Sequence, residues 1–175
     1  MSPESQVLCM RIAAYWDSLP RPTAIVDYCG LEEASLSRKL EGKTWREADL
    51  GGDLGAEDLF IFLNPPGKLY FLGAVMLHVL GLCDHGKDMI SISYPMIGLV
   101  SALRLISKSS LEFAEEVSAR PDCFVIVRDF VAYVFSLPET QEGFEEECTA
   151  VPQYWRTLES LREHMAKEQA KHRES

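Results

Sequence analysis

A continuous apolar stretch near the middle of the chain constrains the fold more than any other feature. Residues 69–83, LYFLGAVMLHVLGLC, are apolar or small except for His78, and they follow the helix-starting pair Asn64-Pro65. A helix that is apolar on every side lies in the centre of a packed helical domain. The stretch is shorter than the roughly 18 apolar residues that a membrane span requires. We therefore predict an all-α, multi-helix globule built around a buried central helix at about 66–83.

Signals for helix starts and ends divide most of the remaining sequence into further helices. Ser2 and Pro3 begin a first helix that stops at Pro20. Thr44 and Glu47 form a capping box, in which a hydroxyl and a carboxylate satisfy free backbone N–H groups, so a third helix starts there and Gly51-Gly52 ends it within two turns. The other helices are predicted over about 31–40 before Gly42, from Pro95 to about 106, from a cap at Ser109, from Pro121 and, after an acidic loop that follows Pro138, from Pro152.

Two short apolar segments do not distinguish helix from strand by their pattern. Residues 59–63 fit a buried strand or a helical turn, and we favour helix because no partner strand is evident. Residues 89–93 alternate weakly and could form one short β-ribbon.

A chain of 175 residues fits one domain, so we expect a single helical domain over 1–168 and a polar C-terminal tail over 169–175. The polar end of the last helix should fray or project.

The cysteines and the N-terminus indicate a reducing compartment. The five cysteines are odd in number, are widely spaced and form no C-x-x-C pair, so we expect reduced thiols in the core. The first residues, MSPESQVLCMRIAAYW, lack a basic region ahead of the apolar ones, which argues against a signal peptide. The predicted location is therefore the cytoplasm.

The charge of the chain is strongly negative and unevenly distributed. A net charge of −10 argues against nucleic acid and against an anionic membrane surface as partners. Residues 47–58 hold five carboxylates and no base, and residues 139–147 hold five more. These segments are either solvated loops that maintain solubility or a surface that docks onto a basic protein. For the docking surface we predict two aromatic anchors amid acid, namely Trp45 and Phe144, with Glu47, Asp49, Asp53, Glu57, Asp58, Glu139, Glu142, Glu145, Glu146 and Glu147.

For Trp45, packing onto the core is the stronger alternative to an exposed anchor, because a tryptophan in a capping box normally packs that way.

Other residues that could take part in catalysis or metal binding give weak signals. Cys83, Asp84, His85 and Asp88 could form a metal site or an activated thiol, but neighbouring residues on a turn rarely converge on one atom and no zinc-type spacing is present. His78 is expected to be an ordinary histidine of the core. The sequence therefore predicts no catalytic residue, no metal and no cofactor.

A short pattern of packing residues resembles a known protein group. Glu32, Gly42, Trp45 and Leu54 precede Phe62-Leu63-x-Pro65 and Tyr70-x-Leu72-x-Ala74. This pattern over about residues 15–80 resembles a small bacterial family of uncharacterised proteins, although this chain has Gly73 where that family has proline and Pro66 where it has an acidic residue. The resemblance implies a helical fold, and it implies nothing about an activity.

Three classes of function remain open. The first is a non-enzymatic inhibitor, an immunity-type protein that neutralises a cognate bacterial toxin, because rigidly held carboxylates can occupy a basic active-site cleft without chemistry. The second is a small hydrolase or transferase with its site at Asp84 and His85. The third is a helical subunit of a homo-oligomer, which an outward-facing stripe of Trp155, Leu158, Leu161 and Met165 would indicate.

Overall fold

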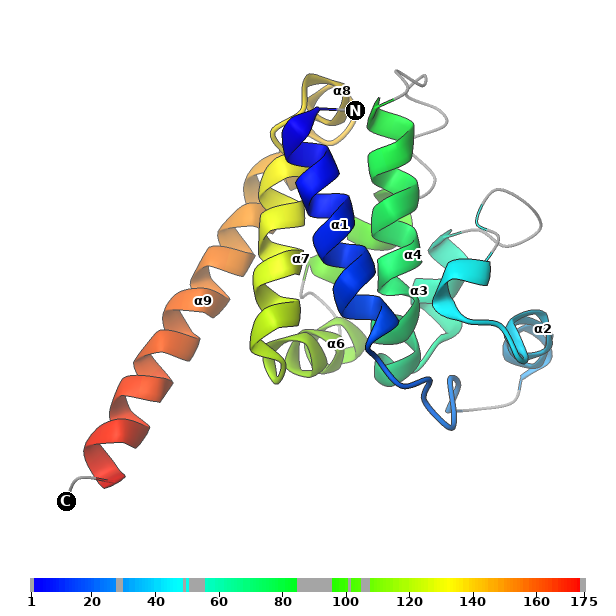
Figure 1. The fold of residues 1–175 in the computed structure, drawn as a ribbon, viewed down its shortest axis with the longest axis horizontal. Coiled ribbons are helices and arrows are strands. Elements are labelled where there is room, and N and C mark those ends of the chain that lie inside the picture. Colours follow the sequence, from blue (N-terminus) through cyan, green and yellow to red (C-terminus); the bar gives the residue numbers. More distant parts are fainter. Residues whose placement is uncertain are drawn as a thin grey trace.

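The computed structural model describes residues 2–27, 30–48, 50, 56–84, 96–100, 102–104 and 108–173, which form an all-α fold without a strand (Figure 1). The predicted fold class is confirmed for these residues, while the weakly alternating segment 89–93 lies outside them. The elements are α1 (Pro3–Asp17), α2 (Leu31–Leu40), the 3₁₀ turn η1 (Trp45–Glu47), α3 (Ala56–Phe62), α4 (Pro65–Asp84), α6 (Lys108–Ser118), α7 (Pro121–Val134), α8 (Pro138–Gln141) and α9 (Glu145–Arg173), with further helical residues at 96–100 and 102–103.

Helix α4 is the central element that the apolar stretch predicts. Before its first turn, the side chain of Asn64 accepts a hydrogen bond from the Gly67 amide at 2.9 Å, which satisfies a free N–H of the helix start. Its side chains are buried against α1, α3, α6 and η1. By length and composition alone Pro65–Cys83 could cross a membrane, but 67% of this window is buried inside the fold, as in the core helix of a soluble protein.

Three other long helices pack one after another, beginning at α4. Helix α1 packs on α4, α7 packs on α1, and α9 packs on the far side of α7 (Figure 1). One hydrophobic cluster extends through this order, from Leu8 and Trp16 on α1 to Phe130 on α7 and Trp155 on α9. The C-terminal part of α9 extends away from the other helices, as the polar composition predicts, and this helix runs to Arg173 without a break at the predicted boundary of the tail.

Several helix ends follow the predicted local chemistry. The Ser2 hydroxyl accepts from the Ser5 amide at 3.0 Å, with Pro3 at the first position of α1. Gly42 follows α2 with a φ of 70°, a left-handed conformation that glycine adopts without a steric penalty. Residues 59–62 belong to α3, so helix was the correct choice there. The capping box at Thr44 is present, but it begins only the single 3₁₀ turn of η1, and Gly51-Gly52 lie outside the described residues.

Two predicted boundaries in the C-terminal part are wrong. Residues 139–147 were expected to form an acidic loop, but they include α8 and the first turn of α9. Helix α9 begins at Glu145, and Pro152 lies inside it rather than at its start. Three glutamates in the first turn of α9 favour the earlier start, because negative charge is stabilised near a helix N-terminus. Similarly, α6 begins at Lys108, so Ser109 is inside that helix and does not precede it.

We predict that the packing of α1 on α4 is intolerant of a side chain at Gly73. A Cβ atom there would lie 2.5 Å from Cγ and 2.7 Å from Cδ1 of Trp16, whose exposed fraction is 0%. Gly73→Ala should therefore lower the free energy of unfolding by about 1–3 kcal/mol, measured by urea denaturation. Gly81 is the control on the same helix, because nothing lies within 4 Å of its Cβ position. Gly81→Ala should raise stability by up to about 1 kcal/mol, and equal effects of both changes would contradict this packing.

Candidate functional site

Of the residues predicted for the first contact region, the structure describes the side chains of Trp45 and Glu47. Trp45 is 3% exposed and belongs to the hydrophobic cluster, so the expectation of an exposed anchor is wrong and the alternative of core packing is correct. Glu47 is exposed, but its carboxylate accepts from the Thr44 amide at 2.7 Å and from the Thr44 hydroxyl at 2.9 Å. These two bonds hold the pKa of Glu47 below its usual range. Asp49 and Asp53 lie outside the described residues, and Glu57 and Asp58 lie on α3.

An open hollow of about 550 Å³ lies between η1 and α4. Trp45, Glu47 and Leu50 form one side of it, and Leu77 and His78 form the other. The guanidinium of Arg46 lies 4.5 Å from the centre of the Trp45 ring and pairs with Asp17 at 2.6 Å. Glu47 therefore faces a shallow surface rather than an enclosed polar site. His78, which was expected in the core, is half-buried on α4 and lines this hollow.

The second acidic segment holds several exposed carboxylates. Glu142 and Glu145 are exposed, and Glu139 lies on α8. Phe144 is 9% exposed and packs in the core, so the prediction that it is an exposed anchor is also wrong. Its burial anchors the α8–α9 junction and leaves the neighbouring glutamates at the surface. The junction therefore presents charge without an aromatic contact.

Arg104 neutralises part of this charge. Its guanidinium donates to Glu146 at 2.9 Å and to Glu147 at 3.0 Å. The side chain of Glu146 nevertheless remains 77% exposed, whereas that of Glu147 is 20% exposed. The four carboxylates of Glu142, Glu145, Glu146 and Glu147 and the one guanidinium of Arg104 together carry a formal charge of −3.

The residues of the predicted enzyme alternative are not brought together in the described part of the fold. Cys83 is half-buried on α4 and Asp84 is the last residue of that helix. His85 and Asp88 lie outside the described residues, so the turn itself remains a prediction. Within the described part of the chain, no group of three His, Cys, Asp or Glu residues could hold a metal ion. Cys9, Cys83, Cys123 and Cys148 form no disulfide bond, and burial raises the pKa of Cys123 to about 12.

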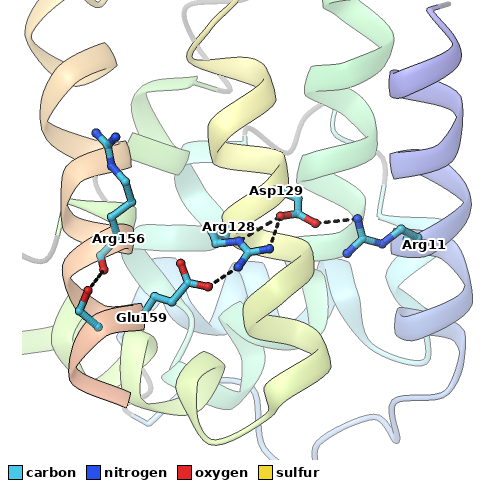
Figure 2. A network of polar contacts seen from close by, with 6 residues as sticks. Arg11, Arg128, Asp129, Arg156 and Glu159 are labelled. Atoms are coloured by element: carbon cyan, nitrogen blue, oxygen red, sulfur yellow. Dashed lines mark hydrogen bonds and ion pairs between the residues drawn. The ribbon is translucent and has the colours of Figure 1, made fainter. Parts of the chain in front are cut away.

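A polar network between three helices is the feature that sequence reasoning missed (Figure 2). Arg11 on α1 pairs with Asp129 on α7 at 2.7 Å, and the same carboxylate accepts from the neighbouring Arg128 at 2.8 Å. Arg128 also donates to Glu159 on α9. The adjacent charges of Arg128 and Asp129 in an otherwise apolar helix were the available sign of this network, but their partners on α1 and α9 are distant in sequence. Burial raises the pKa of Asp129, but the hydrogen bonds from Arg128 and Arg11 outweigh it, so the net pKa is below the usual range.

Comparisons with known proteins identify no relative. No family model matches the chain, and no curated protein or solved structure is significantly similar to it. The resemblance to the bacterial family with the tryptophan and F-L-x-P pattern therefore stays a prediction.

We predict that Asp129 stabilises the fold in a pH-dependent manner. Because its pKa is lower in the folded chain than the value of about 3.9 in an unfolded one, its contribution is complete above that value and is lost as pH falls through the folded pKa. Asp129→Asn should lower the free energy of unfolding by about 1–2 kcal/mol near pH 7. Urea denaturation should show this difference shrinking in acid. The exposed Glu115→Gln is the control, and a difference that persists unchanged at low pH would contradict this role.

Proposed function

We propose that this chain is a non-enzymatic binding protein, an immunity-type inhibitor that neutralises a cognate bacterial toxin through an acidic surface. The observation that carries the proposal is the accessible negative charge at the α8–α9 junction. There Glu142 and Glu145 are exposed without an ion pair among the described residues, and the Glu146 side chain adds a largely exposed carboxylate. A protein with a net charge of −10 would attract a basic partner over a long range and orient it toward such a surface.

The rigid placement of this surface supports the inhibitor role. Glu145 stands in the first turn of a long helix, and buried Phe144 fixes the start of that helix in the core. The backbone that carries these carboxylates is already ordered before binding, which favours affinity. The four described cysteines form no disulfide bond, which agrees with the cytoplasmic location that we propose for the inhibitor. The first acidic segment, which the sequence suggested as the main contact region, is the second contact region of this proposal, with Glu47 as its exposed described carboxylate.

We predict that the double variant Glu142→Gln and Glu145→Gln weakens binding of the basic partner about tenfold or more, because two uncompensated carboxylates leave the contact surface. The partner would be captured from the native cytoplasm with the tagged protein, identified by mass spectrometry, purified and titrated by calorimetry at two salt concentrations. The loss of affinity should be larger at the lower salt concentration.

The control for this experiment is the double variant Glu32→Gln and Glu41→Gln on α2. Like Glu145, Glu32 stands in the first turn of a helix, and like Glu142, Glu41 is the residue that follows a helix end. Both pairs change the net charge equally, so a general charge effect would weaken binding the same way in both. Equal losses, or a partner that is not basic, would contradict the proposed surface.

One observation favours a second candidate, the homo-oligomer subunit. Trp155 is buried, but Tyr154 and Leu161 are 39% and 54% exposed and, being seven residues apart, they share a face of α9 with half-buried Leu158. If this face joins two copies, the chain should sediment as a dimer at micromolar concentration and Leu161→Lys should make it monomeric. The exposed Gln153→Lys serves as the control. A monomer at all concentrations would exclude this candidate.

A further inference from the structure

A second hollow, of about 380 Å³, lies between α7, α8 and α9 on the opposite side of α7 from α1. Its apolar wall includes the rings of Phe135, Pro152 and Trp155, and its polar groups include Arg128, Gln141 and Arg156. Small-molecule sites have this character, a mainly apolar cavity of roughly 300–1,000 Å³ with a few polar groups that orient the ligand. The volume is at the small end of that range, which indicates a compact ligand.

The two arginines of the hollow differ in their charge balance. Arg128 is already neutralised by Asp129 and Glu159, and Asp129 is shared with Arg11, so this network of two cations and two anions has no net charge. Arg156 forms no ion pair with any described residue. In Figure 2 its side chain extends along α9, away from Glu159 and toward the preceding turn of the helix. The hollow therefore offers one uncompensated positive charge, which suits a single negative charge on a ligand.

One residue that lines the hollow has a side-chain donor without a hydrogen-bond partner. The indole Nε1 of Trp155 is enclosed and has no partner in the described part of the chain, whereas Trp16 Nε1 donates to the Leu69 carbonyl at 2.8 Å. Burial raises the pKa of the Cys148 thiol, so this wall adds no negative charge near neutral pH.

We propose that this hollow binds a compact organic monoanion, a carboxylate on an apolar or aromatic body. The carboxylate pairs with the Arg156 guanidinium, whose planar set of N–H donors matches the two oxygens of a carboxylate. The body packs on Phe135, Pro152 and Trp155, and the Trp155 indole N–H becomes a second donor as the ligand enters. This site is separate from the proposed protein-binding function, because it takes a small anion on α7 and α9 rather than a basic protein at the α8–α9 junction.

Titration of the uniformly ¹⁵N-labelled full chain with phenylacetate tests the proposal. The three tryptophans give three indole N–H signals, and Trp155→Phe identifies the one that belongs to Trp155. Phenylacetate should shift the Trp155 signal in a saturable manner with a Kd of about 1 mM or below. The Trp16 signal should stay unchanged because its N–H is already bonded. Absence of a saturable shift of the Trp155 signal at about 10 mM phenylacetate would overturn the site.

Two matched comparisons separate this site from weak general binding. Arg156→Gln, a change of an exposed residue, should raise the Kd for phenylacetate about tenfold or more. Arg38→Gln, a change of an exposed arginine on α2, should leave it unaltered. Phenylacetamide, the neutral analogue, and acetate, which lacks the ring, should each bind about tenfold more weakly. Equal binding of phenylacetamide, equal binding of acetate, or a Kd unchanged by Arg156→Gln would each overturn the proposal.

Discussion

The contact of Trp16 with the backbone of α4 is the constraint on which the rest of the fold depends. The indole ring lies so close to Gly73 that no side chain fits between them, and its N–H donates to the Leu69 carbonyl at 2.8 Å. The contact therefore combines close packing with a satisfied buried polar group, which a tryptophan needs when it is enclosed. It fixes α1 against the most apolar helix of the chain. Because α7 packs on α1 and α9 packs on α7, their positions follow from this first contact.

An ion network joins the outer helices of the fold. The network of Arg11, Asp129, Arg128 and Glu159 joins α1, α7 and α9 at positions where each side chain is about one-third exposed. Pairs with this exposure contribute modestly to stability. The network pairs two arginines with two carboxylates, so it adds no net charge to this part of the surface. The net charge of −10 is therefore carried by other residues.

The sequence predicts the elements whose signals are local. Ser2 with Pro3, Asn64 with Pro65, and Pro121 each begin a helix where predicted, because a cap and a fixed φ act within one turn. Pro152 was misread for a physical reason. A proline inside a helix removes one hydrogen bond, and the favourable charge of the glutamates ahead of it together with the burial of Val151 and Trp155 can offset that loss.

The candidate site was less predictable because it depends on tertiary contacts. Trp45 and Phe144 stand among acidic residues in the sequence, which suggested exposure, yet both rings belong to the core. Local composition describes the neighbours along the chain and not the neighbours in space. The pairing of Arg11 with Asp129 spans 118 positions, so no local pattern contains it.

In the acidic segment at the α8–α9 junction, some carboxylates are paired within the fold and others face solvent. Glu147 is 20% exposed and is held by Arg104 beside the helix start, so its charge is used mainly within the fold. Glu146 also pairs with Arg104 but remains largely exposed, so its carboxylate takes part in the fold and also faces solvent. Glu142 follows α8 and precedes α9, where it neither benefits from the α9 N-terminus nor pairs with a described residue. Its negative charge is therefore not accounted for by these two stabilising interactions, and it remains available for the recognition of a basic surface that we propose.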